Sequence, residues 1–168
     1  MPDNAGAALA GAFMTRLDAV ERRLRALATT PAGATRGHLT GADPGTGEQW
    51  EWGQVWAHLA EFVPYWVAQA QGVIRAYRGD AVPFGRTKAD AERIAAIERD
   101  RGVDVARLWA RLDAQIGDLR AFLGDLPDGA WSARGAHSTL GAMPLERIVD
   151  EFLVGHLEQH AAQLEALG

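Results

Sequence analysis

The sequence predicts an all-α fold, a four-helix bundle with one short extra helix, on the strength of three observations. Four long stretches repeat apolar residues at steps of three and four, as amphipathic helices do. Segments rich in glycine and proline separate these stretches. No stretch of useful length alternates apolar and polar residues as a half-buried strand would. A chain of 168 residues has a natural length for one domain, so we assign residues 1–168 to a single bundle.

The first helix is predicted over residues 7–28. Its apolar face consists of Leu9, Phe13, Leu17, Val20, Leu24 and Leu27. Residues 29–49 are dense in Gly, Pro and Thr, which is typical of a loop. A loop of this length is uncommon in a compact domain and is often functional.

The second helix is predicted over residues 51–77. Its apolar face consists of Trp52, Val55, Trp56, Leu59, Phe62, Val63 and Trp66. Pro64 lies inside this helix and should bend it, because proline has no backbone N–H to donate. Residues 78–87 break the pattern, and a shorter helix is predicted over residues 89–99.

The third long helix is predicted over residues 103–123, and a second long loop follows it up to residue 143. Its inward residues are Val105, Leu108, Leu112, Ile116, Leu119, Phe122 and Leu123. Pro144 suits the first turn of a helix, and the fourth long helix is predicted over residues 144–167.

Composition excludes several classes of protein. The chain has no cysteine, hence no disulfide, thiolate ligand or cysteine nucleophile, which fits a reducing cytoplasm. Its 17 basic residues are scattered and its net charge is −5, which does not favour nucleic acid as a partner. No apolar run is long enough to span a membrane, and the start lacks the basic region of a signal peptide. The chain is rich in Ala and Arg with Lys88 as its single lysine, which suggests a GC-rich bacterial genome.

Two histidines lie within the apolar stripe of the fourth helix. With Leu145 at zero on a regular helix, His156 and His160 fall at about 20° and 60°, near the centre of the buried face. Residues four apart stack on one face, so the two imidazoles are placed to share one metal ion. The alternative is a pair of core histidines with hydrogen-bond partners, which the apolar neighbours do not supply from their side chains.

A third histidine, His58, lies at the edge of the apolar face of the second helix. Alone it would be a boundary histidine, but if the second and fourth helices face each other it completes a three-histidine set. Three imidazoles with one open position describe a catalytic type of site for a divalent metal. Zinc and nickel are our first choices, although iron(II) and copper suit the same ligands. His38 and His137 are predicted to be surface residues in the loops.

The segments "VWAHLAEFVPYW" and "GHLEQHAAQL" resemble the DinB-like (damage-inducible) helical bundle superfamily, which includes mycothiol-dependent maleylpyruvate isomerases and bacillithiol S-transferases. The resemblance covers essentially the whole chain. It implies an up-down-down-up bundle, a homodimer, and a divalent metal held at the positions of His58, His156 and His160. The mycothiol-dependent isomerases have a carboxylate at one of the two fourth-helix positions, where this chain has histidine, and they carry an extra C-terminal domain.

The metal would lower the pKa of a bound water or thiol. The leading hypothesis is therefore an S-transferase or isomerase that uses a low-molecular-weight thiol and acts on a small-molecule substrate. The alternatives are a metal-dependent hydrolase and a non-catalytic, metal-binding stress-response bundle. Candidate cofactor-binding residues are Arg36 and Arg134, for a carboxylate, and Trp131, for an apolar wall; solvated loop arginines are the alternative for the first two. No catalytic residue is identified. The open position should face a cavity beneath loops 29–49 and 125–143.

Overall fold

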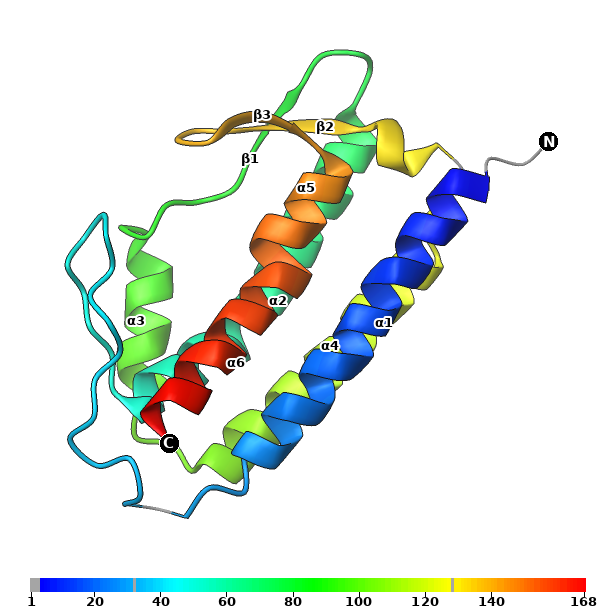
Figure 1. Ribbon diagram of the computed structural model, residues 1–168. Helices are drawn as coiled ribbons and strands as arrows, with labels where there is room; N and C mark the ends of the chain where they lie inside the picture. Colours follow the sequence, from blue (N-terminus) through cyan, green and yellow to red (C-terminus); the bar gives the residue numbers. More distant parts are fainter. Residues whose placement is uncertain (1–3, 32, 128) are drawn as a thin grey trace.

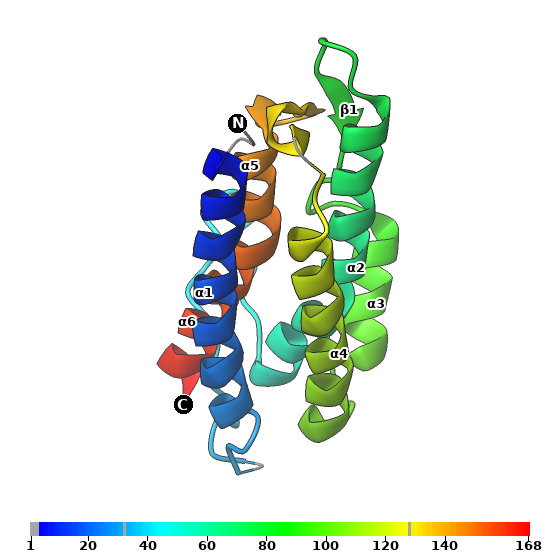
Figure 2. The ribbon, with the colours of Figure 1, turned by 90° about the vertical axis from the view of Figure 1, so that its right-hand side faces the viewer.

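Four long helical segments lie side by side in the computed structural model, which describes residues 4–31, 33–127 and 129–168 (Figures 1 and 2). They are α1 (Asn4–Leu27), α2 (Trp52–Ala76), α4 (Val105–Gly124) and a continuous fourth segment built from α5 (Leu145–Val149), η2 (Asp150–Val154) and α6 (Gly155–Leu167). The first and fourth segments run in one direction, whereas α2 and α4 run in the other. The predicted up-down-down-up bundle is confirmed.

Each long helix packs against two others. The pairs in contact are α1 with α4, α1 with α6, α2 with α4, and α2 with α6. Fully buried side chains from all four segments fill the space between them, among them Leu17, Leu24, Trp56, Phe62, Leu108, Leu112, Ile116 and Leu157. The second and fourth segments therefore face each other, antiparallel, as the three-histidine hypothesis requires.

The parallel helices α2 and α4 need a connection that returns along the bundle. This connection consists of β1 (Val82–Phe84) and α3 (Ala91–Asp100), and α3 packs on α2. Asp90 caps α3 by accepting a hydrogen bond from the backbone N–H of Arg93 at 2.9 Å. The short helix predicted over residues 89–99 is thus confirmed within two residues at each end.

A three-stranded sheet covers one end of the bundle (Figure 1). The strand β2 (Arg134–His137) pairs in parallel with β1 and antiparallel with β3 (Gly141–Pro144), after a 3-10 turn, η1 (Ala130–Ser132). The prediction that residues 78–87 and 124–143 form loops without strands was wrong. Strands of three and four residues are too short to show an alternating pattern, and the β1–β2 pairing joins segments that are distant in sequence.

The helix α2 continues through Pro64. Proline has no backbone N–H to donate to the carbonyl four residues earlier, and a side chain donates to that carbonyl instead. The residue four positions earlier is Ala60, and its carbonyl accepts a hydrogen bond from Gln115 Nε2 on α4 at 2.9 Å. The missing intrahelical bond is replaced by a contact that ties α2 to α4.

A π-helical turn, η2, interrupts the fourth segment just before the two histidines. A π-turn accommodates one more residue than an α-turn, so the following residues are rotated by about 100° relative to a regular helix. The buried residues accordingly change phase, from Leu145, Ile148 and Val149 before it, through Leu153 and Val154 within it, to Leu157, His160, Ala161 and Leu164 after it. The prediction that both histidines lie in the buried face is confirmed for His160, which is buried, whereas His156 is half-buried.

Gly53 allows the start of α2 to approach the end of α3, and it provides a test of this packing. A Cβ at Gly53 would lie 2.1 Å from the carbonyl oxygen of Arg101, whereas a Cβ at Gly72, in the same helix, would meet nothing within 4 Å. We expect Gly53→Ala to lower the free energy of unfolding by about 2 kcal/mol or more. Gly72→Ala should leave it unchanged or raise it by up to about 1 kcal/mol. Urea denaturation measures both, and equal effects would contradict the described contact.

Candidate metal centre

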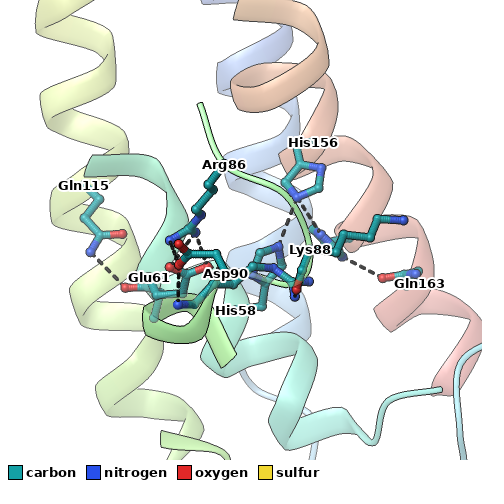
Figure 3. Close-up of polar contacts among 11 residues, drawn as sticks. His58, Glu61, Arg86, Lys88, Asp90, Gln115, His156 and Gln163 are labelled. Carbon is teal, nitrogen blue, oxygen red and sulfur yellow. Dashed lines mark hydrogen bonds and ion pairs between the residues drawn. The ribbon is translucent and has the colours of Figure 1, made fainter. Parts of the chain in front are cut away.

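Three histidine side chains from two antiparallel helices converge inside the bundle (Figure 3). His58 extends from α2, and His156 and His160 extend from consecutive turns of α6. The Nε2 atom of His156 lies 3.0 Å from Nε2 of His58 and 3.0 Å from Nε2 of His160. One ring nitrogen from each residue lies within 4.8 Å of the other two. The structure therefore brings the three residues of the predicted set together.

The outward nitrogens of two of these rings are held by acceptors, which fixes where the protons lie. Nδ1 of His58 donates to Oε1 of Glu61 at 2.8 Å, and Nδ1 of His160 donates to Oε1 of Gln163 at 2.6 Å. A neutral imidazole that donates from Nδ1 carries a lone pair on Nε2. Both lone pairs therefore point inward, toward His156.

This donor set fits a divalent metal ion. A neutral His156 has at most one proton on Nε2, so it would have to share that proton between two lone pairs, whereas a cation satisfies all three nitrogens. Metal–nitrogen bonds of about 2.0–2.1 Å in a tetrahedral site separate the nitrogens by about 3.3 Å, close to the 3.0 Å observed here. The outer hydrogen bonds are the kind that orient metal-binding histidines.

An arginine holds the carboxylate that orients His58. Nη2 of Arg86 lies 2.7 and 2.8 Å from the two oxygens of Glu61, and both side chains are only 9% exposed. The Arg86 guanidinium also stacks over the ring of Tyr65 at 4.1 Å. Burial raises the pKa of Glu61, and the bonds to Arg86 oppose that effect. The bonds to Arg86 thus favour the ionised form of the carboxylate and hold it against Nδ1 of His58.

The outer residues Glu61, Gln163 and Arg86 were not predicted from the sequence. Glu61 and Gln163 each follow a candidate ligand by three positions on the same helix, so the i, i+3 spacing was a usable signal for both. Arg86 lies in the connection between β1 and α3, far in sequence from all three histidines. No local pattern therefore indicated that it pairs with Glu61.

Aromatic rings form the walls around the three histidines. The ring of Phe62 lies 5.1 Å from that of His58 and 4.7 Å from that of His156. The ring of Trp50 lies 5.1 Å from His58 and stacks on His160 at 6.0 Å. Trp50 comes directly after the predicted 29–49 loop, so the end of this loop lies beside the cluster. The cavity expected beneath the loop stays a prediction. Trp50 was not predicted from the sequence to lie near the site.

The surroundings keep all three imidazoles neutral. Burial is the largest cause in each case: it lowers the pKa of His160 to about 4 and the pKa of His58 and His156 well below the ordinary value of 6.5. The positive charge of Arg93, at the start of α3, lowers the pKa of all three further. Neutral imidazole is the form that binds metals.

The other predicted residues lie away from these rings. Arg36 and Arg134 are exposed, and Trp131 stacks on Phe13 of α1 with ring centroids 5.9 Å apart. No contact joins any of the three to the histidine cluster within the described part of the chain, so their role in cofactor binding stays a prediction. The strands β2 and β3 of the predicted 125–143 loop lie at the sheet end of the bundle, whereas α6, which carries two of the histidines, extends toward the other end (Figure 1).

The two remaining histidines differ from each other. His38 is exposed, as predicted, and its Nδ1 donates to the backbone carbonyl of Leu167 at 2.8 Å. The prediction that His137 is a surface residue was wrong. It lies on β2 and is 6% exposed, with its ring packed against Trp66 and Phe152. Its Nε2 donates to the backbone carbonyl of Arg86 at 3.0 Å, so the sheet supports the residue that holds Glu61.

The fold and the site together define a four-helix bundle that carries a buried three-histidine group of the metal-binding kind. The family is the DinB superfamily, to which the chain belongs: the model of that superfamily matches residues 12–164. No curated protein is similar enough in sequence to be matched.

A solved structure has the same fold. It is YfiT from Bacillus subtilis, described as "a probable metal-dependent hydrolase with an unusual four-helix bundle topology". The two structures align with a TM-score of 0.71 over 94% of this chain and 85% of that one, at 19% sequence identity. Within the described residues, no helix is both long enough and apolar enough to cross a membrane.

The buried histidines predict a pH dependence of the metal-free protein. Their pKa values are lower in the folded chain than in the unfolded chain, so unfolding takes up protons between about pH 6.5 and pH 4. The free energy of unfolding should therefore fall as the pH falls through that window. Urea titrations of metal-free protein at pH 7.5, 6, 5 and 4.5 measure this. A variant with phenylalanine at all three positions should lose most of the slope, and an unchanged slope would contradict the assignment.

Glu61 provides a test of the outer bonds. We expect Glu61→Ala to weaken the affinity for Zn²⁺ by about 10- to 100-fold, because His58 loses the acceptor that orients it. Glu61→Gln keeps an acceptor oxygen and should lose less. Glu146→Ala, at an exposed position of α5, serves as the matched control and should bind like the parent. Competition with a chelating dye measures all four affinities.

Proposed function

We propose that this protein is a divalent-metal-dependent enzyme that activates a small nucleophile at the three-histidine group. The observation that carries the proposal is the convergence of three neutral imidazoles whose Nε2 atoms lie 3.0 Å apart in two pairs. A purely structural pair of core histidines would not direct two Nε2 lone pairs at a third imidazole. The metal-dependent description of YfiT supports the proposal.

The chain's own residues bind and orient. His58, His156 and His160 would hold the metal, and when bound the metal would act as a Lewis acid that lowers the pKa of a coordinated nucleophile. Because the three ligands are neutral, they would leave its charge uncompensated. Glu61 and Gln163 fix two of the rings by accepting their Nδ1 protons. Trp50 and Phe62 keep bulk water away from one side of the group.

Two nucleophiles suit this site, and a separate observation favours each. A low-molecular-weight thiol would make the protein an S-transferase or isomerase, as the resemblance of its sequence to thiol-dependent members of the superfamily suggests. Water would make it a hydrolase, as the description of YfiT suggests. A small-molecule substrate, and a homodimer as the functional form, belong to the same proposal.

The enzyme and a non-catalytic metal binder are separated by assay. Elemental analysis of the purified protein comes first, and a stoichiometric divalent metal is expected. The metal-loaded protein is then incubated with a panel of thiols and a chlorodinitrobenzene-type electrophile, and in parallel with a panel of ester and amide substrates without thiol. Turnover that disappears with a chelator and returns with metal supports catalysis. Metal binding without turnover in either panel would favour the non-catalytic alternative.

We expect His160→Ala to cost metal occupancy much more than it costs folding. The variant loses one of three ligands, whereas the helices that carry the site bury many other side chains. Metal content should fall well below stoichiometric, while the helical circular dichroism stays near that of the parent. His38→Ala removes an exposed histidine outside the cluster and should retain full metal content. Loss of helicity together with metal would show instead that the site is structural.

A further inference from the structure

Arg93 is a buried arginine beside the histidine cluster. It lies in the first turn of α3 and is 8% exposed. Its Cζ lies 5.3 Å from the centroid of the Trp50 ring, and that ring lies 5.1 Å from the ring of His58. The distance from Cζ of Arg93 to the centroid of the His58 ring therefore cannot exceed the sum of these two distances. A ligand that extends over this distance from the histidines would contact it.

The guanidinium of Arg93 has no anionic partner within the described residues. Its one hydrogen bond is from Nη1 to the backbone carbonyl of Lys88 at 2.9 Å, and no carboxylate lies within ion-pair distance. The other basic residues of the same segment are paired: Arg86 with Glu61, and Lys88 with Asp43. Figure 3 shows Arg86 and Lys88 on the strip of chain that passes beside the histidines. Arg93 is thus the basic residue of this segment that has no carboxylate at ion-pair distance among the described residues. Glu48, Glu61 and Asp43 act on it only at longer range.

A buried charge without a partner is costly, and here the cost would increase when the site is loaded. Burial lowers the pKa of Arg93, which is the signature of an incompletely compensated cation. The three neutral imidazoles contribute no negative charge, and a divalent ion would add positive charge nearby. Buried charges in proteins are normally paired. The loaded site therefore lacks an anion, and the guanidinium has free N–H donors to bind one.

We propose that Arg93 is the anion-binding residue of the site and that the ligand taken up beside the histidines carries a carboxylate that pairs with its guanidinium. This inference rests on the proposed metal-dependent function and names the chemical class of its substrate or thiol cofactor. A planar guanidinium matches a carboxylate in a two-point contact, and the stacking on Trp50 holds it in position for that contact. In this proposal Arg93 binds that carboxylate, in place of the exposed Arg36 and Arg134.

The test compares two thiol probes of nearly equal size, one with a carboxylate and one with a neutral amide. Co²⁺-loaded protein is titrated with 3-mercaptopropionate and with 3-mercaptopropionamide, and the thiolate-to-cobalt absorption band reports binding without any turnover. We expect the parent protein to bind the carboxylate probe more tightly by about tenfold or more, as a charge-assisted hydrogen bond implies. Arg93→Gln should bind both probes equally, and Arg93→Lys should keep part of the preference.

Controls separate this proposal from the function on which it rests. Arg107→Gln removes an exposed arginine of α4 and should keep the parent's preference. Cobalt content and circular dichroism verify that each variant is folded and loaded, with Arg93→Lys as the second variant if Arg93→Gln does not fold. A loaded parent that binds both probes equally, or variants at Arg93 that keep the parent's full preference, would overturn the role of Arg93 and leave the metal centre intact. A parent that takes up no cobalt would overturn both.

Discussion

The antiparallel contact between α2 and α6 is the constraint on which the arrangement of this molecule depends. It brings one histidine from α2 against two from α6, so that three ring nitrogens share a volume that no single helix could supply. The contact also explains the rest of the topology. With α2 and α4 parallel, the chain must return along the bundle between them, and that return places α3 and the segment before it beside the histidines.

The groups around the site differ in charge with their distance from its centre. The innermost groups are neutral imidazoles, the next contain a carboxylate and an amide that accept their protons, and outside these lies an arginine that neutralises the carboxylate. The sheet supports this arginine, because His137 on β2 donates a hydrogen bond to the backbone carbonyl of Arg86. A short series of hydrogen bonds thereby connects the sheet at one end of the bundle to the histidine cluster.

Much of the fold was predictable from the sequence because helical periodicity is local. The faces of residues 7–28 and 103–123 show it over five or six turns, and the histidines stand out because they interrupt such a face. Short strands and the π-turn were not predictable. A three-residue strand carries too few side chains for a pattern, and η2 differs from an α-turn by one residue. Arg86 and Arg93 were missed because they approach the site through the connection between β1 and α3, whose course depends on tertiary packing.

Because of the π-turn, the number of residues between Pro144 and the histidines determines which way the histidines face. Removing one residue from Asp150–Val154 would restore a regular helix with stronger backbone hydrogen bonding, and the apolar residues on either side would remain in the sequence. Yet the two halves of the segment would then turn by about 100° relative to each other, and with α5 held in the core His156 and His160 would leave the face of α2. The number of residues from Pro144 to His156 therefore determines whether the two histidines face α2. In comparing related bundles or designing new ones, that spacing is as informative about the site as the identity of the histidines themselves.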